Sequence, residues 1–295
     1  DMMTDLNNDE YLNHWANKLC DVEEQNRNID IAKSLYTLHL KRAENCGDFL
    51  ELAEDIISEN YLNDKNWATE LYQRAVDLAE ESNDFLSLGD SIVSADRLDD
   101  KKWAKSLYAS AIEKSGVANE FKDIAISIAH NEKLNDKAWA REIFKRAIEN
   151  ASDVFDYKEI AESIADEDGV NDKEWAKEIF QKAIDSSESL SDYQSIANSI
   201  ADECYLNDKV FGAEILQKGI DSFGISYSHE ATEIGYDLIN NFNDKIWAKK
   251  VYQKGIDICE DNEQKKEVIQ DIRDVLEDGE WAKKLSQEFN IELED

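Results

Sequence analysis

Proline is absent from the 295-residue chain, which also has only ten glycines and four cysteines. Without proline nothing forces a kink or an abrupt stop in a helix, so the turns depend on Asn, Asp and Ser. No apolar run approaches the ~20 residues that a membrane helix needs, and we expect no contact with a membrane. The cysteines show no short pairing, which favours reduced thiols and a cytoplasmic location; they are Cys20, Cys46, Cys204 and Cys259.

Basic residues are also scarce: 33 Lys and Arg stand against 67 Asp and Glu, a formal charge of -34. Such a surface repels phosphate backbones, so we expect no direct binding of nucleic acid. It attracts basic partners at rates that fall with salt. Hydrophobic residues make up 42% of the chain, enough for a core, so the high charge does not indicate disorder.

The chain is rich in internal repetition. At a step of 36 residues a block returns that reads Asn or Asp, then Asp, Lys, any residue, an aromatic residue and a small residue. A period of this length indicates stacked units, each too small to bury its apolar face alone. We predict that the aromatic residues of the blocks pack between repeats as a structural core and do not stack on a ligand; they are Trp67, Trp103, Trp139, Trp175, Phe211, Trp247 and, in a shortened last copy, Trp281.

Each block is expected to begin an amphipathic helix, called helix B. In the repeat that starts at Asn171, apolar residues recur at helical offsets through Ile184. Asn171 or Asp172 is expected to supply the N-cap, and Glu174, three residues after Asn171, to complete a capping box. In the Asp-Lys pairs of successive blocks we expect Asp to cap the helix and Lys to keep the edge soluble, while binding of a charged peptide is the alternative.

A second apolar stripe before each block predicts another helix, called helix A. Capping spacing precedes it from Asp48 to Glu51, from Asp156 to Glu159 and from Ser191 to Gln194. Small residues predict close approach of the two helices, with Ala53, Gly89, Ala125, Ala161 and Ala197 in helix A and Ala75, Ala111, Ala147 and Ala183 in helix B.

Helix B carries the pattern Ala-x3-Phe/Tyr-x2-Ala, as in Ala68, Tyr72 and Ala75, and helix A carries Leu88-Gly89. On these residues the chain resembles the tetratricopeptide repeat and its Sel1-like relatives. The 36-residue length and Gly169-Val170 favour the Sel1-like branch, whereas the turn from helix A to helix B is longer and the family's terminal proline is missing. The resemblance covers roughly residues 10 to 285 and implies a fold more than a function.

The repeats predict an all-α fold, namely an α-solenoid of stacked antiparallel helix pairs with a right-handed superhelix. We expect one domain over residues 1–295, with an N-terminal capping helix region at 1–30, tandem helical repeats over 31–282 and an acidic C-terminal tail over 283–295.

One repeat, between residues 211 and 236, is irregular. Four of the ten glycines fall in it, and Ile234 and Leu238 indicate an apolar stripe of helix A that is shifted by about two residues. We expect a local change in superhelical curvature there, with a partner contact or simple sequence drift as alternatives.

The chain shows no catalytic motif. It lacks a nucleophile elbow, a phosphate loop and a His-Glu-x2-His sequence, and its four His leave few general bases. We therefore expect no enzyme, no catalytic residue and no cofactor. The residue types of a zinc site are present near the N-terminus, but their spacing is wrong, so we expect no metal site at His14, Cys20, His39 and Cys46.

Polar positions of helix A are the candidates for binding a partner. In the resembled family this helix lines the inner groove, and the resemblance places there Glu51, Glu54, Asp55, Asp90, Asp123, Glu159, Glu162 and Asn198. A neighbouring serine column is interpreted as small residues that ease helix contact; it comprises Ser91, Ser127, Ser163 and Ser199.

These features predict a non-enzymatic protein-protein interaction scaffold or adaptor whose concave groove binds a basic protein segment or peptide. The alternative is an acidic inhibitor that mimics nucleic acid and blocks a DNA-binding protein or nuclease. That alternative requires carboxylates gathered along one convex ridge.

Overall fold

A computed structural model describes residues 9–20 and 28–293, which form sixteen α-helices and no strand. They divide into two compact units, Asp1–Ala151 with Asp168–Val170 and Ser152–Glu167 with Asn171–Asp295. The first unit contains α1 (Asp9–Cys20), α2 (Ile29–Leu40), α3 (Cys46–Ile57), α4 (Lys65–Leu78), α5 (Ser82–Val93), α6 (Lys101–Lys114), α7 (Ala118–Ala129) and α8 (Lys137–Asn150). The second contains α9 (Val154–Ala165), α10 (Lys173–Asp185), α11 (Leu190–Ala201), α12 (Lys209–Phe223), α13 (Ser228–Asn240), α14 (Lys245–Ile258), α15 (Asn262–Asp274) and α16 (Gly279–Phe289).

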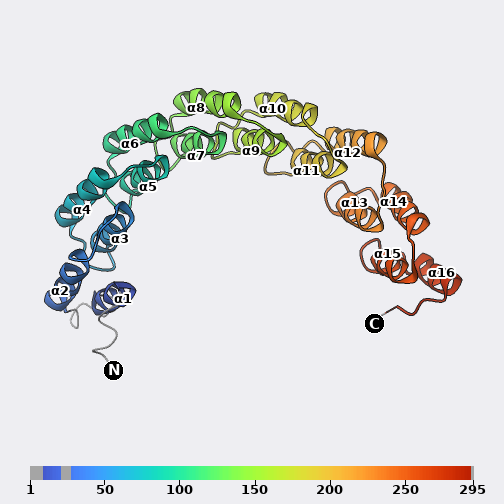
Figure 1. Ribbon diagram of the computed structural model, residues 1–295, viewed down its shortest axis with the longest axis horizontal. Helices are drawn as coiled ribbons and strands as arrows, with labels where there is room; N and C mark the ends of the chain where they lie inside the picture. Colours follow the sequence, from blue (N-terminus) through green and yellow to red (C-terminus); the bar gives the residue numbers. More distant parts are fainter. Residues whose placement is uncertain (1–8, 21–27, 294–295) are drawn as a thin grey trace. The chain divides into compact units, whose positions relative to one another are not determined.

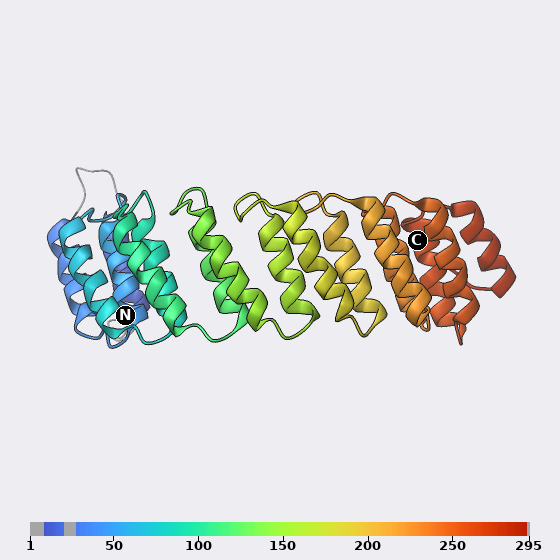
Figure 2. The ribbon, with the colours of Figure 1, turned by 90° about the horizontal axis from the view of Figure 1, so that it is seen from above.

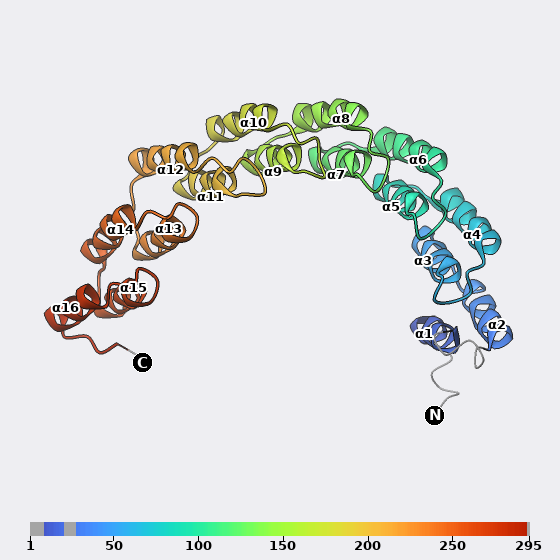
Figure 3. The same cartoon turned by 180° about the vertical axis from the view of Figure 1, so that it is seen from behind.

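Odd-numbered helices are the A helices and even-numbered helices are the B helices. Each A helix packs on the B helix that follows it. Within each unit the A helices lie side by side in one layer, and the B helices form a second layer (Figure 1, Figure 3). Neighbouring helices of a unit run alongside one another when the layers are viewed from above (Figure 2). The predicted all-α fold of stacked helix pairs is confirmed.

The three residues of the Asn-Asp-Lys block have separate roles in the backbone. The first adopts a left-handed conformation with φ between 50 and 57°, which Asn and Asp tolerate better than most residues. The second is the N-cap: Asp172 Oδ1 accepts a hydrogen bond from the backbone N–H of Trp175 at 3.0 Å. The third, Lys173 in this block, begins helix B. The capping box predicted from Asn171 to Glu174 is therefore wrong, because Asn171 precedes the cap.

The A helices also begin earlier than their sequence spacing suggested. Asn45 caps α3, and its Oδ1 accepts a hydrogen bond from the backbone N–H of Asp48 at 3.0 Å. The Asp48 carboxylate in turn accepts from the N–H of Asn45 at 3.2 Å, so Asp48 completes a capping box that begins at Asn45. The N-caps of α9 and α11 are likewise Asp153 and Ser189, upstream of the predicted positions.

The small residues that we predicted between the two helices are buried. The alanines of both sets have no exposed surface. Gly89 lies in the same column of α5, where an added Cβ would come within 2.7 Å of the Tyr108 ring. Large side chains such as Tyr72 and Phe144 fill the space around these small residues and are fully buried. Burial of each such side chain stabilises the fold by about 1.5–3 kcal/mol.

The aromatic column from Trp67 to Trp281 is half-buried at the seams between consecutive repeats. Trp67 lies edge-on to Tyr36 of the preceding B helix, with ring centroids 6.4 Å apart, and Trp103 meets Tyr72 at the same distance. Such ring pairs contribute about 0.5–1.5 kcal/mol beyond the burial of their area. At these two seams the ring pair joins consecutive repeats, and both indoles remain partly exposed to solvent.

The irregular repeat has a shifted A helix, as predicted. α12 is fifteen residues long and ends at Phe223, with Gly224 as its C-cap at a φ of 74°. The cap of α13 falls at Tyr227, and the buried stripe then runs through Ile234, Gly235 and Leu238, while Glu233 is exposed. The shift by two residues is confirmed, and the change of curvature stays a prediction.

The ends of the array follow the same helical pattern. α1 lies within the predicted capping region and packs on α2 as the other A helices pack on their partners. α16 continues to Phe289, so residues 283–289 of the predicted acidic tail are helical. Among residues 9–20 and 28–293, the helices are too short or too polar to cross a membrane.

Candidate functional site

The eight partner-binding candidates lie on five A helices, α3, α5, α7, α9 and α11. The structure places most of them in hydrogen bonds or ion pairs between one A helix and the next. Asn13 Nδ2 donates to Glu51 Oε1 at 2.8 Å, for example, and joins α1 to α3. Much of the predicted groove chemistry is thus used to hold repeats together.

In the first unit a basic residue in the turn after an A helix reaches back to the preceding A helix. Lys133 Nζ lies 2.8 Å from Asp90 Oδ2, and Arg97 forms the equivalent ion pair with Glu54. Asp90 also accepts hydrogen bonds from the hydroxyls of Tyr108, at 2.6 Å, and Ser127, at 3.0 Å. Asp90 therefore connects three structural elements.

The serine column takes part in the same network. Ser91, Ser127 and Ser199 are buried, which fits their interpretation as small residues at a close contact. Each also forms hydrogen bonds: Ser91 shares one with the hydroxyl of Tyr72 at 2.7 Å and accepts another from Arg97 at 2.6 Å. The interpretation of these serines as spacers alone was incomplete.

The second unit contains a related network in which amide groups stand in place of the basic turn residues. Asn198 Nδ2 donates to Asp237 Oδ2 at 2.8 Å, and Gln194 donates to the same oxygen at 2.6 Å. Asn241 Nδ2 donates to Asn198 Oδ1 at 3.1 Å. Glu162 is paired with Lys158 at 3.1 Å and accepts a hydrogen bond from Ser199.

The two remaining candidates are Asp123 and Glu159. The Asp123 side chain is 44% exposed, and its carboxylate lies 3.6 Å from the ammonium of Lys122. Glu159 is half-buried on α9. Both carboxylates are therefore partly accessible to solvent.

Asp55 is a titratable group and not an open groove residue. It is half-buried on α3 and accepts a hydrogen bond from Asn17 at 3.2 Å. Burial raises the pKa of its carboxyl to about 6, helped by the negative charges of Glu51 and Glu54 and opposed by the bond from Asn17.

The raised pKa of Asp55 predicts how stability depends on pH. Because the pKa is about 6 in the folded chain and ~3.9 in an unfolded one, the folded state favours the proton. The stabilisation from Asp55 is thus complete below pH ~4 and is lost as pH rises through ~6. We expect Asp55→Asn to raise the free energy of unfolding at pH ~7.5 by about 1–2 kcal/mol and to have little effect near pH ~4.

Urea unfolding of the wild type and Asp55→Asn across this pH range checks the prediction. The comparison of two chains cancels the titration of the other acidic residues. Parallel stability profiles would show that the carboxyl of Asp55 titrates normally.

A polar hollow of about 770 Å³ opens on the second unit, where the turn after α11 meets α9 and α13. It brings together the predicted residues Glu162 and Asn198 with Asp202, Glu203 and Tyr205, which the sequence analysis did not single out as binding residues. Its lining includes three carboxylates, of Glu162, Asp202 and Glu203, and one lysine, Lys209. We call this site the acidic hollow; its chemistry suits a cationic group of a partner.

The acidic hollow is poorly suited to nucleophilic catalysis. Cys204 is its exposed thiol, and a hydrogen bond with Asp202 together with that carboxylate's charge raises the thiol's pKa. Burial, followed by the charge of Glu162, likewise raises the pKa of Tyr205. Both groups are therefore neutral at pH 7, and the thiolate that a cysteine nucleophile needs is disfavoured.

The residues considered for zinc have other roles. His39 is buried, and its Nδ1 lies 2.6 Å from Asn13 Oδ1. Cys20 and Cys46 are buried and are not in disulfides. Within the described part of the chain, His, Cys, Asp and Glu side chains form no group of three that could hold a metal ion.

The two layers carry charge of opposite sign. The A helices contain 21 acidic and 6 basic residues, a net charge of -15, whereas the B helices contain 14 acidic and 22 basic residues, a net charge of +8. The contrast is clearest between α3, with four acidic and no basic residues, and α6, with four lysines and one acidic residue. The same signs hold within each unit, so acidic character belongs to the A layer and the turns.

Comparison of the chain with protein-family models finds no match, and comparison with curated proteins finds none either.

The basic residues of the turns, Arg97 and Lys133, were not among the residues predicted from the sequence. They stand one repeat apart, and each follows its carboxylate partner by 43 residues, at Glu54 and Asp90. This paired recurrence of opposite charges at one fixed separation is the signal that could have revealed the network.

Proposed function

We propose that the protein is a non-enzymatic scaffold, similar to tetratricopeptide and Sel1-like arrays, that holds a basic protein segment against its A layer. The charge of the two layers is the observation that carries the proposal. Acidic residues exceed basic ones by 67 − 33 = 34, so even complete ion pairing would leave 34 carboxylates without a cation. The A helices, with a net charge of -15, are the more acidic of the two layers, so they attract a cationic partner more strongly than the B helices do.

The acidic hollow gives the partner a defined contact in the second unit. Asp202 and Glu203 are exposed, whereas Glu162 is already paired with Lys158. A lysine or arginine of the partner would reach the carboxylates of Asp202 and Glu203 without breaking the network between repeats. Asn198 and Asn241 can contribute polar contacts at the inner side of the hollow.

The alternative, an acidic mimic of nucleic acid, is less well supported. It requires a ridge of carboxylates along one face, but the face formed by the B helices contains more Lys and Arg than Asp and Glu. A DNA-binding surface is positively charged and needs a continuous row of carboxylates, which the charge balance of this layer does not favour.

Salt dependence of peptide binding tests the proposal. We expect a fluorescent Lys/Arg-rich peptide of about 12 residues to bind at least ~10-fold more weakly at about 300 mM salt than at about 50 mM, while a matched acidic peptide does not bind. Fluorescence anisotropy measures both affinities.

A pair of charge-reversal variants separates a defined site from general attraction by the net charge. Glu203 lies in the acidic hollow and Glu188 lies before α11, and both are exposed in the second unit. Glu203→Lys is expected to weaken binding of the basic peptide about 5-fold and Glu188→Lys less than about 2-fold. Equal effects, or binding that ignores salt, would contradict the proposal.

A further inference from the structure

A lysine contact recurs between consecutive B helices. Lys105 of α6 places its Nζ 2.9 Å from Oδ2 of Asp136, the N-cap of α8, and 4.8 Å from the ring centroid of Trp139. The ammonium thus bridges the free oxygen of a capping carboxylate and the face of an aromatic ring. Both contacts favour a cation, the first by charge and the second through the quadrupole of the ring.

The same arrangement occurs in the second unit. Lys177 lies 3.2 Å from Asp208 and 4.3 Å from the centre of Phe211. Lys249 lies 2.6 Å from Asp278 and 4.7 Å from the centre of Trp281. In the sequence the column reads Lys33, Thr69, Lys105, Arg141, Lys177, Ala213 and Lys249, so five of its seven positions are basic.

At the contact between α12 and α14, Ala213 stands where Lys105, Lys177 and Lys249 stand in their repeats, so the lysine is missing. Asp244 still caps α14, and its Oδ1 accepts the backbone N–H of Trp247 at 2.8 Å. Within residues 28–293, Asp244 has no ion pair and the Trp247 indole has neither a cation nor a ring partner. Leu216 stands where the earlier repeat has Tyr72, which explains the missing ring partner.

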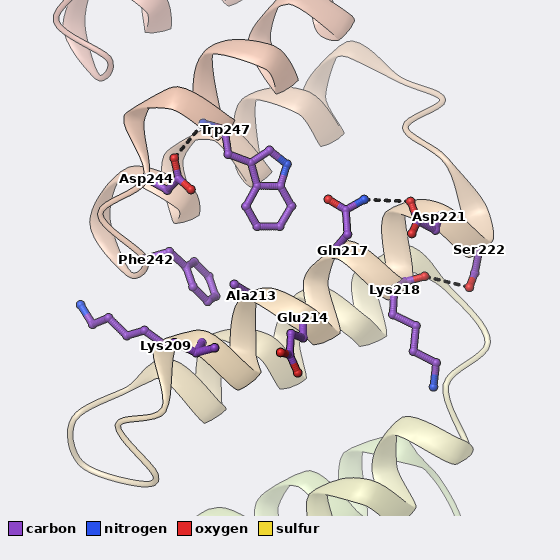
Figure 4. Close-up of a pocket in the computed structure, with 11 residues that line it drawn as sticks. Lys209, Ala213, Glu214, Gln217, Lys218, Asp221, Ser222, Phe242, Asp244 and Trp247 are labelled. Carbon is purple, nitrogen blue, oxygen red and sulfur yellow. Dashed lines mark hydrogen bonds between the residues drawn. The ribbon is translucent and has the colours of Figure 1, made fainter.

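A cavity of about 750 Å³ occupies this position, and we call it the lysine notch. Ala213, Phe242 and Trp247 form its apolar wall, and Asp244 lies at the base of the indole (Figure 4). The side chains of Lys209 and Lys218 extend away from the indole (Figure 4). Lys218 instead lies 5.6 Å from the centre of the Tyr193 ring.

Thr69 is the other residue of this column that is not basic, and its surroundings differ from those of Ala213. The Thr69 hydroxyl donates to the carbonyl of Lys65 at 2.7 Å, and Trp103 packs on Tyr72 with ring planes at 81°. Trp103 therefore has a ring partner that Trp247 lacks. The loss of both lysine and ring partner distinguishes the contact at Ala213 from that at Thr69.

We propose that the lysine notch binds the side chain of a lysine from a partner protein. Its alkyl chain would cover Ala213 and Phe242, and its ammonium would meet Asp244 Oδ2 and the face of Trp247, as Lys105, Lys177 and Lys249 do in their own repeats. An uncharged apolar side chain would leave the carboxylates of Asp244 and Glu214 without a cation. The notch lies on the B layer and does not depend on the acidic hollow.

Titration of the full chain with a short peptide tests the notch. The probe is a capped Gly-Ser-Lys-Ser-Gly peptide, and its control carries norleucine, which has the alkyl chain without the ammonium. In a nitrogen-15 spectrum, the indole N–H of Trp247, assigned with Trp247→Phe, should shift saturably with the lysine peptide. The norleucine peptide should bind at least about 5-fold more weakly.

Ala213→Lys provides the decisive variant. It restores the residue type of the regular repeats, so the chain should fold, and its own ammonium should occupy the notch. We expect the Trp247 signal to move in this variant and no longer to respond to the lysine peptide. Ile246→Lys adds the same charge at a 76% exposed position outside the notch, and should retain the response.

Two results would overturn the proposal: a Trp247 response that persists in Ala213→Lys, or equal responses to the lysine and norleucine peptides. Glu203→Lys should leave the Trp247 response unchanged. Failure of the notch and failure of the acidic hollow can therefore be told apart.

Discussion

Replacing Asp90 by alanine is expected to lower the free energy of unfolding of the first unit by about 2–4 kcal/mol. Asp90 accepts hydrogen bonds from Tyr108 and Ser127 and pairs with Lys133 at 2.8 Å. Without the carboxylate, the fully buried Tyr108 loses its acceptor and Lys133 loses its counter-charge. The loss at Tyr108 is the larger effect, because a buried hydroxyl without a partner retains its desolvation cost. The Lys133 side chain is 25% exposed, so solvent screens the loss of its counter-charge.

Urea unfolding followed by circular dichroism measures this loss, and two further variants locate its cause. Asp90→Asn keeps an acceptor but removes the charge, so we expect about half the effect. Asp123→Ala removes a carboxylate of the neighbouring A helix that is 44% exposed, and should cost less than about 1 kcal/mol. A loss below about 1 kcal/mol for Asp90→Ala would show that the network contributes little to stability.

Gly235→Ala is expected to destabilise the second unit by about 1–3 kcal/mol, although alanine favours helices. An added Cβ at Gly235 would lie 2.5 Å from Cζ of Tyr252, whose ring is fully buried. The ring cannot move away without disturbing its neighbours, because protein interiors are close-packed. Steric overlap should therefore exceed the helix-propensity gain of about 1 kcal/mol.

Gly279→Ala is the matched control. Gly279 is the first residue of α16, and an added Cβ there would meet nothing within 4 Å. We expect it to be neutral or stabilising by up to about 1 kcal/mol in the same unfolding assay. Combining Gly235→Ala with Tyr252→Leu should give less than the sum of the two losses, since leucine removes the clashing ring atoms. A stabilising Gly235→Ala would show that the second unit adapts freely at this contact.

The sequence was sufficient to predict the stacked helix pairs, because the repeated features that specify them act between residues close together in the chain. A 36-residue period, helical spacing of apolar residues and small residues at fixed positions predicted the A and B helices. The shifted stripe at Ile234 and Leu238 could also be predicted, since burial follows the 3.6-residue period even when the register changes. N-caps were less accurate: Asn171 and Asp172 are both good capping residues, and only the backbone shows that Asn171 takes the left-handed conformation.

The candidate site could be predicted only in part. Sequence spacing placed Glu162 and Asn198 on A helices, but their meeting with Asp202 and Glu203 depends on how a turn folds back over two neighbouring repeats. The contact of Asp90 with Lys133 depends on the stacking of consecutive repeats in the same way. The lysine notch was harder to foresee, because it arises from two departures from the pattern, Ala213 and Leu216.

The sequence by itself determined the helix pairs, their repetition and the large excess of negative charge, because these follow from composition and short-range periodicity. Only the tertiary structure decided which carboxylates bind neighbouring repeats and which face solvent. The physical reason is that an ion pair depends on distance in space and not on distance along the sequence. Glu54 and Asp90 form ion pairs with cations 43 residues away. Asp244, with alanine at position 213, forms none with the described residues.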